Sequence, residues 1–224
     1  SGGMDSATAL AMTRKEVSDV IALTFDYGQR HRKEITAAKR VAAHFRVHDH
    51  RIVTLDLRPI GGSALTDRQI AVPEQRRIEE IGRGIPATYV PARNTILLAY
   101  SLGLSEVTGA DAIVIAANAI DYSGYVDCRP EFYEAFQEVA RLGTKRGVEG
   151  DVIEIRTPLI RMSKADIVRA GEELRVPWAL TWSCYRGGPK ACGICDSCQL
   201  RLKGFREAGV EDPIPYAVRR PTNA

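Results

Sequence analysis

The sequence predicts an α/β protein built on a parallel sheet that helices cover on both faces. Apolar segments of strand length alternate along the chain with segments whose apolar residues recur at helical spacing. Strands that are apolar throughout are typical of parallel sheets buried between two helix layers. The chain has 224 residues, of which 45% are hydrophobic and 26% charged, which is enough to bury the core of one generous domain.

The expected elements alternate in a regular order. Residues 20–25 form an apolar run that ends at a turn, and residues 31–45 carry apolar side chains at helical spacing. Ser163 is a typical residue to cap a further helix. In chain order, the strands and helices are expected at residues 20–25, 31–45, 52–55, 94–107, 112–117, 131–142, 152–156 and from residue 164 onward.

Two stretches depart from this alternation. Residues 58–88 are rich in Arg and Gly and have little periodicity, so we expect an active-site lid or a mobile insertion there. A glycine-rich loop normally joins a strand to a helix, and here it stands at residue 1. We therefore expect an apolar strand upstream of Ser1. Because ligands bind beyond the carboxyl ends of parallel strands, the loops after residues 25 and 117 and the loop at residue 1 are expected to form the site.

The chain opens with Ser1-Gly2-Gly3-Met4-Asp5-Ser6, a pattern typical of a loop that binds phosphate. The two glycines let phosphate oxygens approach the main chain closely. A helix that begins near Met4 would point its free N–H groups at the ligand, and the two serines add hydroxyl donors. The Gly-Lys-Ser/Thr of a Walker A loop is not present in the sequence. On composition alone, the same residues also suit a glycine turn that caps a helix.

Four of the five cysteines lie close together, at Cys184, Cys192, Cys195 and Cys198. Two-residue gaps let neighbouring thiolates converge on one zinc ion, which prefers four such ligands in a tetrahedron. A complete shell of four thiolates leaves no position for water, so we expect a structural Zn²⁺ that contributes on the order of 10 kcal/mol to folding. An iron–sulfur cluster also takes four cysteines, and unrelated free thiols are the remaining alternative. Cys128 stands apart and is expected to be a packed thiol.

Composition, cysteine placement and net charge limit the possible domain organisation, partners and cellular compartment. We divide the chain into residues 1–175, which hold nucleotide and substrate, and residues 176–224, a small zinc-binding segment packed on them. Clustered cysteines without an export signal point to the reducing cytoplasm. No apolar run approaches the roughly 20 residues that span a bilayer, which predicts no membrane association. The net charge of +3 fits small anionic ligands and is too weak to favour nucleic acid.

A polar loop follows the expected third strand. Residues 118–130 carry two acids, two tyrosines, a serine and an arginine. Carboxylates accept hydrogen bonds from the N–H edge of a purine-like base, and tyrosines stack on its face. On composition alone, a surface loop with Pro130 at a helix start explains these residues at least as well.

The hexamer from Ser1 to Ser6 resembles the pyrophosphate loop of the PP-loop ATPases. This resemblance implies a Rossmann-like, adenine nucleotide alpha hydrolase-like fold. It also implies cleavage of ATP between the α and β phosphates, with the pyrophosphate held in the loop and AMP transferred to an oxygen of the substrate. The adenine pocket is implied at Thr24, Phe25 and Tyr27. From the residues alone, a strand core followed by a turn explains these three equally well.

Further motifs resemble the 7-cyano-7-deazaguanine synthases, a family of queuosine precursor synthesis. In chain order they are Phe25–His31, Val90–Asn94, the loop Asp121–Phe132, Thr157–Leu159 with Ser163 and Lys164, and Trp182–Cys184 before the cysteine cluster. The resemblance covers nearly the whole chain. It implies a ligase that adenylates 7-carboxy-7-deazaguanine and replaces AMP by ammonia to give an amide. A second adenylation, on the amide oxygen, then leaves the nitrile.

The same resemblance implies roles for single residues. Catalysis is expected from Ser1, Asp5, Ser6, Arg93 and Lys164. ATP is expected to contact Ser1, Gly2, Gly3, Met4, Asp5, Ser6, Thr24, Phe25, Tyr27 and Asn118. The deazaguanine is expected to contact Arg93, Asp121, Ser123, Tyr125, Asp127 and Tyr185. Mg²⁺ should accompany the polyphosphate, and a homodimer is suggested, for which the apolar helix at 94–107 is a candidate face. A solvated side chain is the plain alternative for Lys164.

Three other functions remain open at this point. A PP-loop ligase that thiolates or otherwise modifies tRNA would share the phosphate loop. The modest charge and the lack of an RNA-binding appendage or of a cysteine placed as sulfur carrier speak against it. A zinc-ribbon module that senses nucleotides would bind ATP without catalysis. A relative that passes the activated deazaguanine to a macromolecule would share every motif named above.

Overall fold

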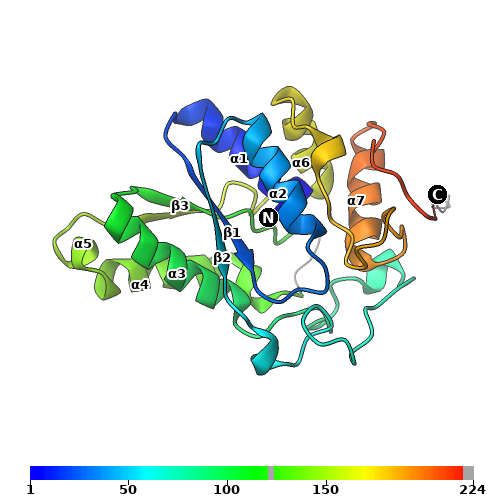
Figure 1. Ribbon diagram of the computed structural model, residues 1–224, viewed down its shortest axis with the longest axis horizontal. Coiled ribbons are helices and arrows are strands. Elements are labelled where there is room, and N and C mark those ends of the chain that lie inside the picture. Colours follow the sequence, from blue (N-terminus) through cyan, green and yellow to red (C-terminus); the bar gives the residue numbers. More distant parts are fainter. Residues whose placement is uncertain (121–123, 219–224) are drawn as a thin grey trace.

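The computed structural model describes residues 1–120 and 124–218, and strands and helices alternate along them (Figure 1). The strands are β1 (Ile21–Asp26), β2 (Asp49–Thr54), β3 (Ala112–Val114) and β4 (Glu154–Arg156). The helices are α1 (Met4–Glu16), α2 (Lys33–His44), α3 (Arg93–Thr108), α4 (Pro130–Gly143), α5 (Lys145–Val148), α6 (Lys164–Glu173) and α7 (Asp196–Glu207). This order confirms the predicted α/β fold.

The strands pair in parallel, as the apolar segments predicted. β1 pairs with β2 from Ile21 opposite Asp49 to Asp26 opposite Thr54. β3 pairs with β4 from Ala112 opposite Glu154 to Val114 opposite Arg156. Among the described residues, these are two separate two-stranded ladders. Strands β1 and β3 end at Asp26 and Val114, close before two of the loops that are expected to form the site.

Side chains of the segment that contains β3 alternate between two hydrophobic cores. Ile113 and Ile115 pack into a cluster formed by α3 and α4, while Val114 and Ala116 pack into a cluster formed by α1, α6 and α7. Successive side chains of a strand point to opposite faces, so helices cover both faces here. In Figure 1, α1, α2 and α6 accordingly lie on the side of the strands opposite α3 and α4.

The third strand is shorter than predicted and ends at Val114, where residue 117 was expected. The register of the β3–β4 pair would place Pro158 opposite Ala116. Proline has no N–H to donate to the ladder, so the pairing stops where β4 gives way to Thr157 and Pro158. The early end frees residues 116–118 to turn toward the pocket described below.

Residues 58–88 are packed against the body of the chain. Ser63 and Ala64 are fully buried. The Arg30 guanidinium donates hydrogen bonds to the carbonyls of Ala64, Asp67 and Ile70, which ties the segment to the loop after β1. A role as a lid stays a prediction.

Helix α6 lies unusually close to its neighbours. A Cβ added at Gly171 would come within 2.2 Å of the Trp178 ring, and one added at Gly204 of α7 within 2.6 Å of the Lys164 Cβ. Only glycine permits these approaches without a shift of the neighbour. The approach of α7 to α6 brings the C-terminal segment against the helix that begins with Lys164.

We predict that Gly171→Ala destabilises the protein by about 1–3 kcal/mol, because the added methyl overpacks against Trp178. The matched control is Gly103→Ala in α3, where a Cβ would meet nothing within 4 Å. Removing a helical glycine there is expected to stabilise the protein by up to about 1 kcal/mol. Denaturant unfolding of both variants measures the difference. Equal midpoints for the two would contradict the packing argument.

Candidate functional site

The phosphate loop forms the start of α1 and one wall of a pocket. Gly3 is the N-cap of α1 in an extended conformation, and no side chain caps the helix. The Ser1 and Ser6 hydroxyls lie 2.9 Å apart across the loop. The first N–H groups of the helix therefore face the pocket, with the positive end of the helix dipole behind them. This is the arrangement that binds anions such as phosphate.

Gly2 lies where no other residue fits. A Cβ added there would come within 2.4 Å of the Ala37 Cβ and the Ala38 nitrogen of α2. The Gly2 carbonyl accepts a hydrogen bond of 2.8 Å from the Trp182 backbone N–H. The phosphate loop is thus held between α2 on one side and the segment before the cysteine cluster on the other.

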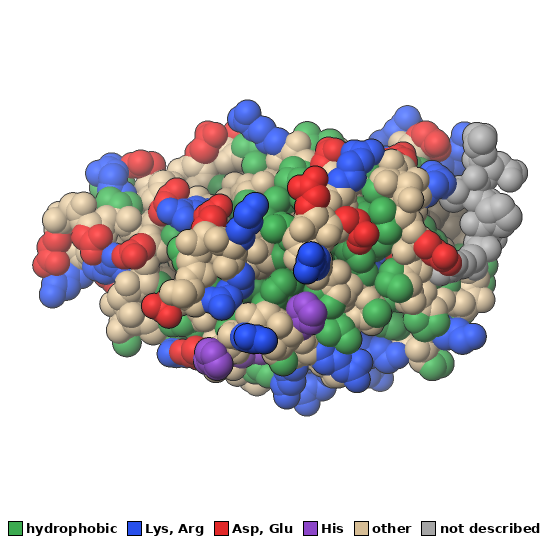
Figure 2. Space-filling model, turned by 90° about the horizontal axis from the view of Figure 1, so that it is seen from above, with side chains coloured by type: hydrophobic (Ala, Val, Ile, Leu, Met, Phe, Trp, Pro, Cys, Tyr) green, Lys and Arg blue, Asp and Glu red, His purple; other side chains and the backbone are tan. Residues whose placement is uncertain are grey.

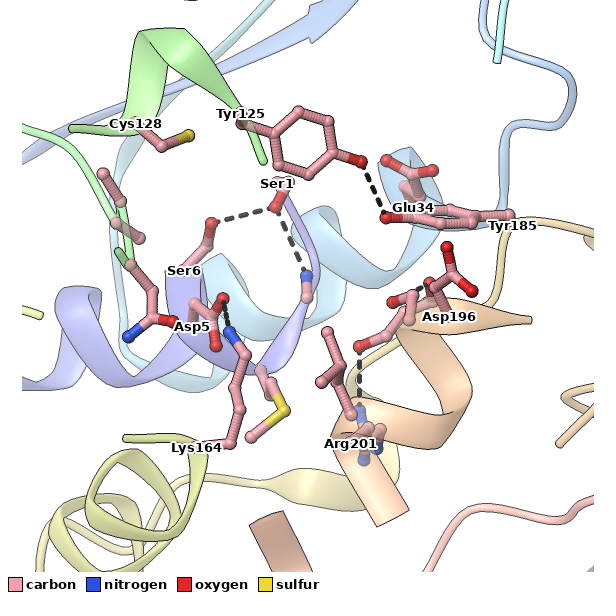
Figure 3. A pocket seen from close by; sticks show the side chains of 18 of the residues that line it. Ser1, Asp5, Ser6, Glu34, Tyr125, Cys128, Lys164, Tyr185, Asp196 and Arg201 are labelled. Carbon is pink, nitrogen blue, oxygen red and sulfur yellow. Dashed lines mark hydrogen bonds and ion pairs between the residues drawn. The ribbon is translucent and has the colours of Figure 1, made fainter. Parts of the chain in front are cut away.

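The pocket has a volume of about 250 Å³ and is open to solvent. Its walls come from five helices, α1, α2, α3, α6 and α7, and from loops near residues 117, 125 and 183. Figure 3 shows Ser1, Asp5 and Ser6 on α1 and its preceding loop, with Lys164 opposite Asp5 and Tyr125 above Ser1. Segments far apart in the chain therefore meet at the carboxyl ends of the strands, as predicted for a sheet of this kind.

Lys164 faces the phosphate loop. Its ammonium lies 2.6 Å from one carboxylate oxygen of Asp5, and its side chain is only 12% exposed. Ser163 caps α6 through a reciprocal pair of hydrogen bonds with Asp166, which fixes where Lys164 leaves the helix. The second Asp5 oxygen is buried and has no hydrogen-bond partner among the described residues. This position differs from that of a solvated surface lysine.

Asn118 is buried beside the same loop. Its side-chain nitrogen donates to the carbonyls of Leu159 and Met162. Its side-chain oxygen is buried and has no hydrogen-bond partner within the described part of the chain. The amide is thus oriented by protein on one side and presents an unused acceptor on the other.

Arg93 and the residues at the end of β1 form the neighbouring wall. Arg93 is the first residue of α3, lines the pocket and lies over the Tyr27 ring at 5.9 Å. Tyr27 is buried, which raises the pKa of its hydroxyl above the ordinary value. Thr24 hydrogen bonds to His50 at 2.9 Å, and Phe25 packs edge-on against Tyr100. Of these, only Arg93 lines the pocket, so adenine contact by Thr24, Phe25 and Tyr27 stays a prediction.

Two of the predicted substrate contacts, Asp121 and Ser123, lie outside the described residues. Tyr125 lines the pocket, and its hydroxyl hydrogen bonds to Thr88 at 2.8 Å and to Tyr185 at 3.3 Å. Tyr185 also lines the pocket. A chain of three hydroxyls therefore links residues 58–88, the polar loop and the segment before the cysteine cluster.

The two carboxylate oxygens of Asp127 differ in their surroundings. One of its carboxylate oxygens accepts a hydrogen bond of 3.1 Å from the Asn94 backbone N–H in the first turn of α3. The other oxygen is buried and has no partner among the residues described. Next to it, burial raises the pKa of the Cys128 thiol to about 11, so this thiol is uncharged at neutral pH.

The four clustered cysteines converge as a metal site requires. All four sulfur atoms are buried and lie within 4.8 Å of one another. Backbone N–H groups of Arg186 and Cys192 donate to the Cys184 sulfur, and that of Cys195 donates to the Cys192 sulfur. A Cβ at Gly193 would collide with the Val218 carbonyl, so the turn between Cys192 and Cys195 depends on glycine. This cluster can hold a metal ion.

A buried ion pair holds the segment that joins the cysteines to the pocket. Arg201 of α7 binds Asp212 through two hydrogen bonds of 2.7 and 2.9 Å, and both side chains are at most 2% exposed. The same guanidinium donates to the hydroxyls of Thr181 at 2.7 Å and Ser183 at 3.3 Å. Between these two residues lies Trp182, whose backbone N–H donates to the Gly2 carbonyl.

The chain matches the family model described as "Queuosine biosynthesis protein QueC" over residues 1–209. The chain belongs to the QueC family. Proteins named 7-cyano-7-deazaguanine synthase are similar to it over nearly their full lengths. That of Nostoc punctiforme is 52% identical over 217 residues, covering 97% of each chain. That of Saccharophagus degradans is 55% identical over 219 residues, covering 97% of this chain and 95% of its own.

These relatives link the chain to queuosine precursor biosynthesis, as the motifs predicted. Solved structures are more distant. An NMN synthetase from Francisella tularensis has a TM-score of 0.48 and 14% identity, with 94% of this chain and 75% of the other covered. A U34-tRNA thiolase, NcsA, from Methanococcus maripaludis with its [4Fe-4S] cluster has a TM-score of 0.46 and 16% identity, with 92% and 62% covered.

Several residues of the QueC pocket were not foreseen from the sequence. They are Glu34, Cys128, Trp182, Ser183, Asp196 and Arg201. Trp182 and Ser183 stand in a motif that carried the family resemblance, so that signal was available. Glu34 and Arg201 lie in amphipathic helices, where a charged residue ordinarily belongs to the solvated face.

We predict that Asp212→Asn destabilises the protein by about 3–5 kcal/mol, because it leaves the buried Arg201 charge without a counter-charge. The control is Glu138→Gln, which removes an exposed ion pair with Arg141 and should cost no more than about 1 kcal/mol. Chemical denaturation monitored by tryptophan fluorescence compares the two. An unfolding midpoint of Asp212→Asn equal to that of the control would be inconsistent with this role.

Proposed function

We propose that this chain is an ATP-dependent carbon–nitrogen ligase that converts 7-carboxy-7-deazaguanine and ammonia into 7-cyano-7-deazaguanine. The observation that carries the proposal is the meeting of the phosphate loop with Tyr125 of the polar loop in one pocket. The names of the relatives support this product. The reaction runs through two adenylations with an amide between them.

The carboxylate needs activation because its charge and resonance resist nucleophilic attack. Transfer of AMP to a carboxylate oxygen removes the charge and supplies a leaving group. Ammonia then forms the C–N bond while the bond to AMP breaks. In the second round the amide oxygen takes the place of the carboxylate oxygen. In both rounds the protein therefore has to position the reacting groups and stabilise negative charge.

The phosphate loop and Lys164 are the nucleotide end of the site. In the proposal, Ser1, Gly2, Gly3, Met4, Asp5 and Ser6 hold the pyrophosphate, and Asn118 contacts the nucleotide. Lys164 supplies positive charge next to the loop, where its ammonium lies 2.6 Å from Asp5. The buried, unpartnered oxygens of Asp5 and Asn118 suit Mg²⁺, which prefers oxygen ligands. When bound, Mg²⁺ would neutralise phosphate charge. Adenine recognition by Thr24, Phe25 and Tyr27 remains part of the proposal.

Arg93, Tyr125 and Tyr185 are the substrate end of the site. All three line the pocket, and the guanidinium of Arg93 suits either a phosphate or the substrate carboxylate. Asp127 is buried and does not itself line the pocket, and in the proposal its unpartnered oxygen accepts a hydrogen bond from the N–H edge of the deazaguanine. Asp121 and Ser123 complete this recognition in the proposal.

The cysteine cluster holds Zn²⁺ in this proposal. A tetrahedron with zinc–sulfur bonds of about 2.3 Å places its sulfurs about 3.8 Å apart. The sulfurs of Cys192 and Cys198 lie 3.8 Å apart. An iron–sulfur cluster is larger than a single ion and would hold the sulfurs farther apart. Four thiolates fill the coordination shell, so this Zn²⁺ supports the fold and takes no part in the chemistry.

The proposal also includes the partners and the compartment. A groove between α3 and α4 is lined by Leu102, Phe132, Phe136 and Val139, and we assign it to a homodimer interface. In Figure 2, acidic and basic side chains are interspersed except along the lower edge, where Lys and Arg predominate. The net charge of only +3 favours small anionic ligands over nucleic acid. Within residues 1–120 and 124–218, no helix has the length and apolar character needed to cross a bilayer. The reducing cytoplasm would keep the four thiols available for metal.

For the metal, we predict one Zn²⁺ per chain by elemental analysis and loss of that ion in Cys195→Ser. The control, Cys128→Ser, changes a thiol outside the cluster and should retain the ion. Removal of the ion should lower stability by an amount on the order of 10 kcal/mol, because binding and folding are coupled. Iron together with a visible absorption band would rule out the zinc site.

For the reaction, we predict that 7-carboxy-7-deazaguanine, ammonium and ATP yield the nitrile with two AMP per molecule, measured by mass spectrometry and nucleotide chromatography. Lys164→Met should lower kcat about 10²-fold, because charge stabilisation at the phosphates is lost. Lys145→Met, at an exposed lysine, is the control. Release of ADP in place of AMP, or transfer of the deazaguanine to tRNA, would contradict the proposal.

A further inference from the structure

The carboxylate of Glu34 faces the pocket from helix α2 and has no role in the function proposed above. Glu34 lies in the first turn of α2 and lines the pocket together with Ser1, Arg93 and Tyr185. Figure 3 shows its carboxylate on the same side of the pocket as Tyr185, away from the pair formed by Asp5 and Lys164. It therefore stands at the substrate end of the site.

Glu34 differs from the other acids of the pocket wall. Of the three carboxylates that line the described pocket, Asp5 is paired with Lys164 and Asp196 with Arg76. Within the described residues, no hydrogen bond or ion pair engages the Glu34 carboxylate. A partly buried carboxylate that faces a cavity without a protein partner is free to bind a cation or a hydrogen-bond donor from the ligand.

The residues around Glu34 shift the pKa of its carboxyl group. Burial raises the pKa of Glu34 above the ordinary value, and the positive charges of His31 and Arg93 oppose that effect. Tyr27 and Tyr125, which also face this region, both have a raised pKa because they are buried, so their hydroxyls stay neutral. A carboxylate with a raised pKa is a stronger base than one in water.

The proposed reaction requires a base that the phosphate end of the site does not supply. Ammonia in neutral water is almost entirely ammonium, which has no lone pair for attack. Conversion of an amide to a nitrile also removes two protons from its nitrogen. Lys164 and Arg93 are cations and cannot attract ammonium. Asp5 already carries an ion pair.

We propose that Glu34 binds ammonium in the pocket and accepts its proton, which makes it the catalytic base for C–N bond formation. This inference rests on the proposed function. One N–H bond of ammonium breaks, its proton passes to the Glu34 carboxylate, and the nitrogen lone pair attacks the adenylated carbon. The C–N bond forms, AMP leaves with the electrons of its C–O bond, and loss of a second proton from nitrogen gives the neutral amide.

The test compares Glu34→Gln, which keeps the shape of the side chain and removes its basicity, with wild type. Glu131→Gln is the matched control, because Glu131 is an exposed acid in the first turn of α4. We expect Glu34→Gln to lower the ammonium-dependent rate at pH 7 by about 10²-fold or more. Exchange of pyrophosphate into ATP with 7-carboxy-7-deazaguanine and no ammonium should stay within a few-fold of wild type.

Hydroxylamine separates a base from a structural residue. It is largely uncharged at pH 7 and needs no deprotonation before attack, so Glu34→Gln should form the hydroxamate at a rate close to wild type. The ammonium-dependent rate of the variant should also rise with pH in proportion to free ammonia. Glu34→Asp, which retains a carboxylate, should keep part of the activity.

Three results would overturn the inference. They are an unchanged ammonium-dependent rate, loss of pyrophosphate exchange in Glu34→Gln, and failure of hydroxylamine to restore turnover. Failure of the proposed function has a different signature, because wild type itself would then show neither exchange nor nitrile, and this inference would fall with it.

Discussion

A buried ion pair between Arg201 and Asp212 holds the loop over residues 181–185 against the phosphate loop. A bidentate pair with both charges out of water has one favourable geometry, because any rotation leaves a buried charge unsatisfied. Nη1 of Arg201 donates to the hydroxyls of Thr181 and Ser183, so Trp182 between them is held in place. Trp182 in turn donates to the Gly2 carbonyl. The geometry of the anion site thus depends on residues nearly 200 positions away in the chain.

The cysteine cluster fixes the other end of that loop. Cys184 is both a member of the cluster and the residue whose carbonyl accepts hydrogen bonds from His31 and Trp182. The next residue, Tyr185, enters the pocket and meets Tyr125. The segment of clustered cysteines therefore positions side chains that line the pocket. The hydrophobic core that contains Met4 also contains Trp178 and Phe205, so it extends across the proposed boundary at residue 175.

The sequence predicted the parts of this protein that depend on local pattern. Apolar periodicity located the four strands and helices α2, α3 and α4, and the spacing of Cys192, Cys195 and Cys198 located the cysteine cluster. The short helix α5 was not predicted. The end of β3 was missed, because it depends on Pro158 in the partner strand. Arg201 and Asp212 were missed for a similar reason. A charged residue in a helix and one in a proline-rich tail both suggest exposure, and only long-range packing brings them together.

In the proposed reaction, the pocket separates two electrostatic tasks that would otherwise conflict. Adenylation gathers negative charge on phosphate and needs the cation of Lys164 and the positive end of α1 nearby. The proposed base is a carboxylate, and a carboxylate beside the phosphates would repel them unless a cation such as Mg²⁺ lay between, as proposed at Asp5. Glu34 projects from α2, on a different wall from Asp5 and Lys164, and burial raises the pKa of its carboxyl. The proposed base and the proposed phosphate-binding cation therefore act from separate walls of one pocket.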